Sequence, residues 1–259
     1  MPRVLARTLA NDLRTRLSHE TTFGAWCATL SPTVVESFAS ADCDWVLLDL
    51  QHSVPSGESL PNLIRAGEVW HLPMIVRPAW NDPALIMSAL DAGAAGIVAP
   101  MINSAEEAER FIQWAKYAPR GARSWGPVIA VGSDDEMTPT TANGSVLCIA
   151  MVETQEAVTN LAEILEVDGI DGIFIGPSDL SIDYTGENFG DGNRAEMEIV
   201  IAEVLHRSLA AGKFVGITTA SGEIAAERAA QGFRFLPAAS DIAVLRKGSA
   251  ALLATARGN

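Results

Sequence analysis

The stretch Gly172-Ile-Phe-Ile-Gly-Pro-Ser-Asp-Leu-Ser181 decides the fold class of this chain. Its short apolar run ends abruptly at a Gly-Pro pair, where the backbone has to turn, and the carboxylate of Asp179 follows at once. A second apolar run, Val146 to Val152, ends in the same way in Glu153. Runs that are apolar on both faces are typical of buried strands in a parallel sheet. We therefore expect both carboxylates at one end of such a sheet, where they suit a divalent metal ion.

Strand-like and helix-like patterns alternate along the whole chain. Apolar runs predict eight strands, near residues 22–29, 45–50, 73–77, 96–100, 146–152, 172–176, 213–217 and 233–237. Helical patterns lie near residues 5–18, 33–40, 58–69, 82–91, 104–116, 155–166, 194–211, 221–231 and 239–256. This alternation within 259 residues favours a closed barrel over an open sheet. The predicted fold class is α/β, a (β/α)8 TIM barrel with an extra N-terminal helix, and residues 1–259 are predicted to form a single domain.

One long segment, residues 118–144, interrupts the alternation and is predicted to be irregular because it is rich in glycine and proline. It lies between the helix after the fourth strand and the fifth strand. The order of a barrel therefore places it at the bottom, where the strands begin. Loops of this length in compact domains usually act as lids, binding loops or subunit contacts.

The composition excludes several classes of partner. A net charge of −14 argues against binding to nucleic acid or to an anionic membrane. The three cysteines Cys27, Cys43 and Cys148 form no C-x-x-C motif and are typical of reduced core residues. Residues 1–20 lack the apolar core of a signal peptide, and the longest uncharged apolar stretch, residues 92–102, is too short to span a membrane. We expect a cytoplasmic protein.

Polar side chains follow four of the predicted strands. His52 comes after the second strand, Arg77 ends the third, Glu153 follows the fifth and Asp179 follows the sixth. In α/β barrels the chemistry lies where the strands end, because the loops there converge on one mouth. The sequence therefore predicts that these four residues face one another.

Each of the four residues also has an ordinary structural interpretation. His52 could be a surface or capping residue, and Arg77 could form an ion pair at the rim. Glu153 could cap the helix that starts near Thr154, and Asp179 could cap a turn. The convergence of a base, a cation and two carboxylates on one face of one barrel favours a functional site.

The four residues form a chemically coherent set. Two carboxylates with open coordination positions suit Mg²⁺ or Mn²⁺, which leaves room for the carboxylate and keto oxygen of a 2-oxo acid. Backbone N–H groups around Gly176 and Ser178 are expected to face that carboxylate. Arg77 would stabilise an enolate oxygen, and His52 would move a proton.

A series of motifs stands in a specific order and spacing along nearly the whole chain: Phe23-Gly-Ala-Trp, Asp44-Trp-Val-Leu-Leu-Asp-Leu-Gln-His, Ile75-Val-Arg-Pro, Leu90-Asp-Ala-Gly-Ala, Ala99-Pro-Met, Tyr117-Ala-Pro-Arg-Gly-Ala-Arg, Val152-Glu-Thr, Gly172-Ile-Phe-Ile-Gly-Pro-Ser-Asp-Leu and Ala239-Ser-Asp. Together they resemble the HpcH/HpaI aldolase family, the metal-dependent class II pyruvate aldolases. The resemblance implies a phosphoenolpyruvate/pyruvate-type barrel and a divalent metal cofactor, Mg²⁺, Mn²⁺ or Co²⁺.

The resemblance also implies a role for each residue. Glu153 and Asp179 match the metal ligands, His52 the proton acceptor, and Arg77 the group that stabilises the transition state. The backbone of Ser178 and Asp179 matches the segment that holds the pyruvate carboxylate.

Asp91 matches the carboxylate that raises the basicity of the histidine. Because Asp91 precedes the fourth predicted strand, it is expected far from its own barrel's site and would serve a neighbouring subunit. The resemblance implies a homo-oligomer, a trimer or a hexamer, which agrees with this placement.

Two positions depart from the family pattern. Met151 stands where a glutamine usually contacts the substrate, and Gln51 stands where glutamate is common. A thioether cannot replace the hydrogen bonds of an amide, so the substrate or its binding mode is expected to differ more than the chemistry.

The implied function is the reversible retro-aldol cleavage of a 4-hydroxy-2-oxo acid to pyruvate and an aldehyde. Examples of such substrates are 4-hydroxy-2-oxoheptanedioate and the 2-dehydro-3-deoxy aldarates and aldonates. Two alternatives remain: a lyase that acts on a CoA thioester, against which the acidity of the chain argues, and a catalytically silent barrel that binds a 2-oxo acid. None of the three lysines follows a strand at the mouth, which argues against a Schiff-base mechanism.

Overall fold

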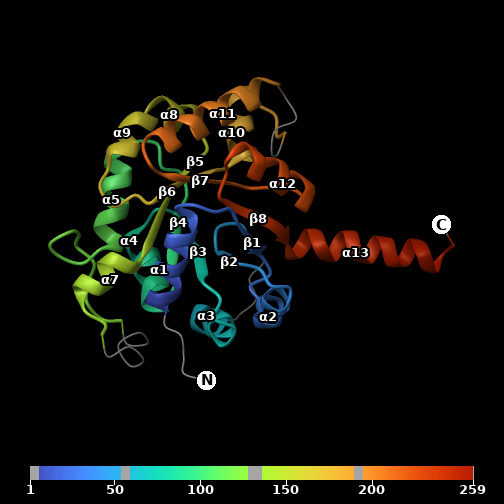
Figure 1. Cartoon of the computed structure of the whole chain (residues 1–259), viewed down its shortest axis with the longest axis horizontal. Helices are drawn as coiled ribbons and strands as arrows, with labels where there is room; N and C mark the ends of the chain where they lie inside the picture. Colours follow the sequence, from blue (N-terminus) through green and yellow to red (C-terminus); the bar gives the residue numbers. More distant parts are fainter. Residues whose placement is uncertain (1–5, 54–58, 128–135, 190–194, 259) are drawn as a thin grey trace.

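Eight parallel strands close into a barrel in chain order, and the last strand pairs again with the first (Figure 1). The computed structural model describes residues 6–53, 59–127, 136–189 and 195–258. The strands are β1 (Thr22–Cys27), β2 (Val46–Asp49), β3 (Met74–Arg77), β4 (Gly96–Ala99), β5 (Leu147–Val152), β6 (Gly172–Ile175), β7 (Phe214–Ile217) and β8 (Phe235–Ser240). This architecture confirms the predicted (β/α)8 TIM barrel.

Helices surround the barrel, and one of them precedes β1 as predicted. They are α1 (Ala6–Leu17), α2 (Pro32–Ser40), α3 (Leu60–Val69), α4 (Pro83–Asp91), α5 (Ala105–Ala115), α7 (Pro139–Ser145), α8 (Gln155–Thr159), α9 (Leu161–Glu166), α10 (Pro177–Thr185), α11 (Ala195–Ala210), α12 (Gly222–Gln231) and α13 (Asp241–Ala256). Short polar side chains fix several of the starts. Asp82 accepts hydrogen bonds from the amides of Ala84 and Leu85 at the start of α4, for example.

Three local predictions are wrong in detail. The helix predicted over residues 155–166 is split at Asn160, which ends α8 and precedes α9. The segment 118–144 is not irregular throughout, because Thr138 and Thr141 form a capping box that starts α7. The Gly-Pro pair after β6 does not leave the chain in a turn: Pro177 is the first residue of α10, where its missing N–H costs nothing.

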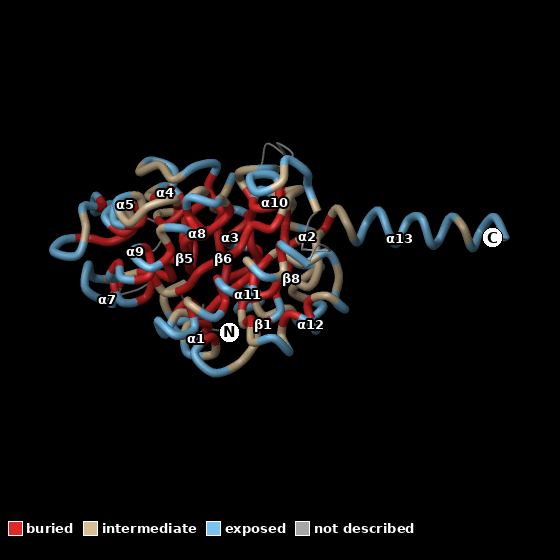
Figure 2. The backbone as a smooth tube through the Cα atoms, turned by 90° about the horizontal axis from the view of Figure 1, so that it is seen from above, coloured by how far each residue is buried: buried red, intermediate tan, exposed pale blue. Residues whose placement is uncertain are grey.

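Large aromatic side chains fill the interior of the barrel. Trp45 stacks on Phe235 with a distance of 3.7 Å between ring centroids, and its indole N–H donates to Thr22 Oγ1 over 2.9 Å. A Cβ on Gly24 would lie 2.1 Å from the Trp45 ring, so only glycine leaves room for this indole. The outward faces of the strands form a second apolar layer with the helices, and Figure 2 shows the buried backbone concentrated in these layers.

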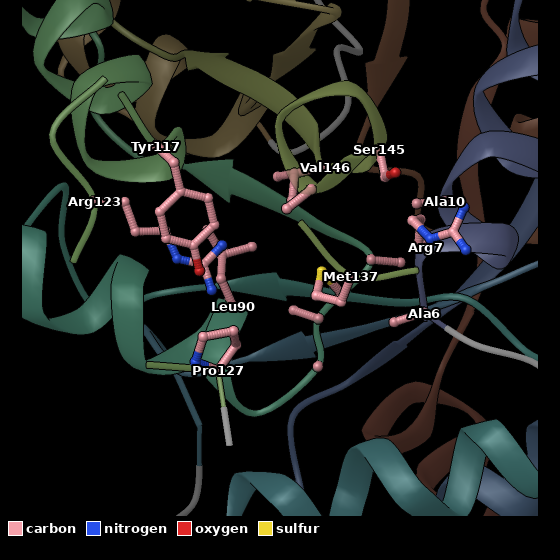
Figure 3. Close-up of a pocket in the computed structure, with 14 residues that line it drawn as sticks. Ala6, Arg7, Ala10, Leu90, Tyr117, Arg123, Pro127, Met137, Ser145 and Val146 are labelled. Carbon is pink, nitrogen blue, oxygen red and sulfur yellow. The ribbon is translucent and has the colours of Figure 1, made fainter. Parts of the chain in front are cut away.

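Helix α1 and the segment before β5 cover the end of the barrel at which the strands begin. The guanidinium of Arg14 donates to the carbonyl oxygens of Ser145 and Val146 and pairs with Asp171 over 3.1 Å. Figure 3 shows a pocket at this end, between Ala6 and Arg7 of α1 and the side chains of Tyr117 and Arg123. The described parts of the segment, residues 118–127 and 136–144, therefore lie at the bottom, as predicted, whereas residues 128–135 lie outside the described residues.

Helix α13 leaves the barrel and projects away from it (Figures 1 and 2). Asp241, its first residue, is the only one of its residues that is buried. The apolar side chains of Val244, Leu245, Leu252 and Leu253 are all exposed. Within the described ranges, the structure has no helix with the length and apolar character needed to span a membrane.

Candidate active site

A cavity of about 260 Å³ lies at the carboxyl ends of the strands. Six of the predicted site residues line it: His52, Arg77, Met151, Gly176, Ser178 and Asp179. These residues lie at or directly after the carboxyl ends of β2, β3, β5 and β6, so the closure of the barrel brings together side chains that lie far apart in the sequence. The remaining two predicted residues, Glu153 and Asp91, do not line this cavity.

Arg77 is held in the mouth by Asp49, a residue that was not predicted to belong to the site. The two residues are opposite each other in the register of β3 and β2. Arg77 Nε donates to Asp49 Oδ1 over 2.9 Å and Arg77 Nη2 to Asp49 Oδ2 over 2.7 Å, with both side chains buried. The bidentate pair fixes the guanidinium plane. Arg77 thus forms an ion pair, as in the alternative interpretation, but the pair is buried and does not lie at the rim.

The third guanidinium nitrogen of Arg77 points elsewhere. Nη1 lies 3.9 Å from the sulfur of Met151, and the guanidinium carbon lies 4.7 Å from the ring centroid of Trp26. A thioether is a weak acceptor, so Met151 leaves the Nη1 donor available for a ligand oxygen. Met151 thus lies beside the Arg77 guanidinium, although its thioether cannot replace the hydrogen bonds of an amide.

Asp49 accepts hydrogen bonds from several residues at the carboxyl ends of β2 and β3. Burial opposes its ionisation, but the hydrogen bonds and charge of Arg77, with further hydrogen bonds from the Trp26 indole and the His52 amide, outweigh burial and lower the pKa of Asp49. The amide of Gln51 also donates to Asp49 Oδ1, over 3.0 Å. The carboxylate therefore shapes the loop that carries the exposed imidazole of His52 to the cavity.

Glu153 lies buried at the end of β5. Its Oε1 accepts a hydrogen bond of 2.8 Å from the amide of Met101, a residue held at a left-handed φ of 55°. Burial raises the pKa of Glu153 to about 7; the Met101 amide opposes this rise and the nearby Asp179 carboxylate adds to it. Glu153 is not a helix cap, because Thr154 is the N-cap of α8 and accepts from the amide of Ala157.

Gly176 lets the Glu153 carboxylate lie against the start of α10. A Cβ at Gly176 would lie 2.4 Å from Glu153 Oε2 and 2.7 Å from the methyl group of Met151. Asp179 is exposed in the first turn of α10 and is not the N-cap. The first amides of a helix, here those of Ser178 and Asp179, have no intrahelical acceptor and form its positive end.

Glu153 and Asp179 suit a hard divalent cation. Both offer carboxylate oxygens, and a bound cation would stabilise the ionised form of Glu153, whose pKa is raised by burial and further by the charge of Asp179. Within the described part of the chain, no cluster of three or more His, Cys, Asp or Glu side chains is placed to hold a metal. A cation held by two carboxylates keeps positions for water or substrate oxygens, as is usual for Mg²⁺.

Asp91 lies at the end of α4, away from the mouth, and lines a separate pocket with Ser124 and Gly126. Its Oδ1 accepts a hydrogen bond of 2.6 Å from Nη2 of the buried Arg123, which stacks over the ring of Tyr117 (Figure 3). The structure therefore does not bring Asp91 together with His52 of the same chain.

Sequence reasoning missed a further part of the cavity wall. Thr218 and Thr219 follow β7, and Ser240 ends β8. The only available signal was their position at the ends of strands. Their residue type gave none, because threonine and serine are common in such places for structural reasons.

The fold and the site together define an enzyme of the TIM-barrel class, with its polar residues at the carboxyl ends of the strands. A family model described as HpcH/HpaI aldolase/citrate lyase matches residues 22–245, and the chain belongs to this family. This confirms the resemblance seen in the sequence.

Two relatives match this chain over most of the length of both proteins. The chain is 41% identical over 255 residues to hydroxypyruvate/pyruvate aldolase of Rhizorhabdus wittichii, which covers 97% of this chain and 98% of the relative. It is 34% identical over 234 residues to 4-hydroxy-2-oxo-heptane-1,7-dioate aldolase of Klebsiella pneumoniae, which covers 89% and 88%. A crystal structure of a family member from Burkholderia cenocepacia matches with a TM-score of 0.88 at 27% identity, over 95% of this chain and 99% of that one. The protein is thus a carbon–carbon lyase of the aldolase type.

Proposed function

We propose that the protein catalyses the reversible, metal-dependent retro-aldol cleavage of a 4-hydroxy-2-oxo acid to an aldehyde and pyruvate or hydroxypyruvate. The observation that carries this proposal is the buried Arg77, whose guanidinium is fixed by Asp49 while Nη1 has no oxygen acceptor among the described residues. It shares one cavity with the imidazole of His52 and the start of α10. The R. wittichii relative, named for both 2-oxo acids, supports the substrate class.

The binding of the 2-oxo acid uses the start of α10. The amides of Ser178 and Asp179 would hold the substrate's carboxylate, because the N-terminus of a helix attracts anions. Arg77 Nη1 would then donate to the 2-oxo oxygen. Negative charge develops on that oxygen as the bond between C3 and C4 breaks, and a fixed donor stabilises the charge without reorganisation.

His52 would act as the base. Its imidazole accepts the proton of the 4-hydroxyl group while the C3–C4 bond breaks, and the bonding electrons pass into the enolate of C2 and C3. The aldehyde leaves with the former C4, and a proton delivered to C3 completes the 2-oxo acid. In the direction of synthesis the same proton returns to the new hydroxyl group.

Glu153 and Asp179 would hold the divalent cation, which we propose to be Mg²⁺, Mn²⁺ or Co²⁺. When bound, such an ion supplies Lewis-acid polarisation of the 2-oxo group. The oxygen-only donor set and the cradle that Gly176 leaves beside Glu153 Oε2 support this assignment.

We further propose a homo-oligomer, a trimer or a hexamer, in which Asp91 serves the His52 of a neighbouring subunit. The unburied apolar residues of α13 support assembly, and the distance of Asp91 from its own mouth supports the neighbour's site. A single barrel over the chain and three free cysteines support one domain and a reducing, cytoplasmic location.

A CoA thioester is the weaker substrate proposal. Among the described residues that line the cavity, Arg77 is the only lysine or arginine, and two of its nitrogens are occupied by Asp49. These described residues therefore offer no row of lysine or arginine side chains to bind the phosphates of CoA.

Pyruvate release tests the proposal. EDTA-treated protein is supplied with a panel of 4-hydroxy-2-oxo acids, with and without Mn²⁺, and pyruvate is measured with lactate dehydrogenase and NADH. We expect release only with the metal, and a strong loss in Arg77→Lys, which keeps the charge but not the bidentate geometry. Release at full rate by metal-free protein, or no release from any acid, would refute the proposal.

A further inference from the structure

A pocket separate from the active site lies at the end of the barrel where the strands begin, between helix α1 and the segment that precedes β5 (Figure 3). The side chains of Tyr117 and Arg123 form part of its wall. We infer that this pocket binds a short aliphatic carboxylate, of two or three carbons, through the Arg123 guanidinium and the Tyr117 hydroxyl. The inference goes beyond the proposed aldolase function and does not depend on it.

Two buried polar atoms of the pocket wall lack a partner. The Tyr117 hydroxyl and Arg123 Nε are buried, and neither makes a hydrogen bond among the described residues. Tyr117 is 3% exposed and Arg123 is 7% exposed. Buried polar groups in native proteins are usually paired with protein atoms, water or a ligand, because an unpaired group loses its hydrogen bonds to water without replacement. Two such atoms at the same end of one pocket, opposite Arg7 in Figure 3, indicate a ligand that accepts hydrogen bonds.

The two side chains are held in place before any ligand binds. The guanidinium carbon of Arg123 lies 4.6 Å from the ring centroid of Tyr117, and Nη2 donates to Asp91 Oδ1 over 2.6 Å. The buried side chain of Asn143 holds the backbone of Tyr117 from both sides. Its Oδ1 accepts from the Tyr117 amide over 2.6 Å, and its Nδ2 donates to the Tyr117 carbonyl oxygen over 2.8 Å. Because these contacts fix the phenol and the guanidinium, a ligand binds with little further loss of conformational freedom.

The charges around the pocket favour an anion. Arg7 and Arg123 line it, whereas none of the lining residues that the structure describes is Asp or Glu. The carboxylate partners of the two arginines, Glu136 and Asp91, lie outside the lining. Burial raises the pKa of Tyr117, so its hydroxyl is protonated at neutral pH and can donate. A carboxylate has two oxygens and can accept from both Arg123 Nε and the Tyr117 hydroxyl, and hydrogen bonds between charged groups are the stronger kind.

The rest of the pocket suits a short apolar tail. Its described wall is otherwise mainly apolar and includes Leu90, Met137, Val146 and several alanines. The cavity of about 40 Å³ has room for about three water molecules, which corresponds to acetate or propionate and excludes longer acids. Water alone would gain no hydrogen bonds along the apolar walls. A short carboxylate matches both the polar end and the apolar sides.

Titration of propionate into EDTA-treated protein tests the inference without metal or aldol substrate. Isothermal titration calorimetry should show a binding site that persists in Arg77→Lys, because Arg77 lies in the mouth at the other end of the barrel. Propionamide has nearly the same shape but no charge, and it should bind about tenfold more weakly or worse. Hexanoate, which is too long for the cavity, should not compete with propionate.

Two variants remove the proposed contacts. Arg123→Lys keeps the charge but has no donor at the position of Nε, and it should lower the affinity for propionate by about ten- to hundredfold. Tyr117→Phe should lower it by about two- to tenfold, the usual difference between losing a hydrogen bond to a charged group and losing a neutral one. Arg120→Lys is the matched control, because Arg120 is exposed, pairs with Asp168 and does not line the pocket. Its affinity should equal that of the wild type.

Thermal unfolding gives a second readout that does not require a weak binding constant. Without ligand, Tyr117→Phe should melt no lower than the wild type, because the substitution removes an unpaired buried hydroxyl. Propionate should then raise the melting temperature of the wild type more than that of Tyr117→Phe, since tighter binding stabilises the folded state more.

Four outcomes would overturn the inference. They are no binding of propionate to the wild type, equal affinities in Tyr117→Phe and Arg120→Lys, equal binding of propionamide and propionate, and a crystal grown with propionate that holds only water in the pocket. A ligand-free Tyr117→Phe protein that melts far below the wild type would also count against it, because the hydroxyl would then already have a partner. Each result leaves the proposed aldolase function intact, because neither the metal nor the residues of the mouth take part in these measurements.

Discussion

Arg77 and Asp49 lie side by side on β3 and β2 and form two nearly parallel hydrogen bonds, of 2.9 and 2.7 Å, in the mouth of the barrel. The pair is almost fully buried. Its geometry determines which guanidinium nitrogen can reach a substrate, because the other two nitrogens are occupied. Asp49 also accepts hydrogen bonds from the amides of the loop that carries His52, so one carboxylate positions both the Arg77 guanidinium and the loop of His52.

Replacing Asp49 should therefore affect stability and catalysis together. Asp49→Asn keeps the size of the side chain but leaves the Arg77 charge buried without its partner. We expect the free energy of unfolding to fall by about 3–5 kcal/mol, as for other broken buried pairs, and aldol cleavage and oxaloacetate decarboxylation to fall together. Denaturant unfolding and both assays check this. An unchanged unfolding midpoint would show that the Arg77–Asp49 pair does not stabilise the folded protein in the way that its burial indicates.

The lowered pKa of Asp49 gives the stability a defined pH dependence. A carboxyl group whose pKa is lower in the folded state stabilises the fold above its unfolded pKa of about 3.9 and loses that contribution as the pH falls through the folded value. The advantage of the wild type over Asp49→Asn should thus be constant near neutral pH and shrink below about pH 4. Urea unfolding between neutral and acidic pH measures it. A difference that grows on acidification contradicts the assigned ionisation.

Gly176→Ala should weaken metal binding without unfolding the barrel. The added Cβ would lie 2.4 Å from Glu153 Oε2 and would displace that carboxylate. We expect the affinity for Mn²⁺ to drop by about 10–100-fold, the range seen when groups around metal ligands are altered. Isothermal titration of Mn²⁺ into EDTA-treated protein measures this. Gly222→Ala, where a Cβ would meet nothing within 4 Å, is the control. Equal affinities in the two variants would show that the Glu153 carboxylate is not a ligand.

Asp91 should act across a subunit boundary. Its ion pair with Arg123 holds it at the bottom of its own barrel, so a role beside His52 requires a neighbour. Co-refolding inactive His52→Ala with inactive Asp91→Ala protein should restore part of the activity, because some hybrid sites receive both native residues. If hybrids form, as shown by differently tagged subunits, and no activity returns, Asp91 has no such role.

The barrel itself could be predicted from the sequence because its strands are apolar on both faces. The run from Val146 to Val152 is an example: it became β5 within one residue of its predicted start. Helix α10 was missed because a Gly-Pro pair is more often a turn, whereas in the structure Gly176 is the N-cap and Pro177 the first residue of the helix.

The site could be predicted only where chain position was sufficient. His52, Arg77 and Asp179 follow strands, and barrel order alone assembles them. The role of Asp49 depends on the register between β2 and β3, which no local pattern encodes. The engaged hydroxyl of Thr219 depends on its hydrogen bond to the carbonyl oxygen of Pro237, a contact between the ends of β7 and β8 that the sequence does not reveal.

The role of His52 as the base is the central claim, and one comparison tests it most directly. Aldol cleavage requires a base for the 4-hydroxyl proton, whereas decarboxylation of oxaloacetate releases CO₂ and needs no base at that step. His52→Ala should therefore lose aldol cleavage by about 10²–10⁴-fold and keep most of its metal-dependent decarboxylation. Equal loss of both activities, in folded protein with unchanged Mn²⁺ affinity, would contradict the account and make His52 a residue that binds or orients the substrate.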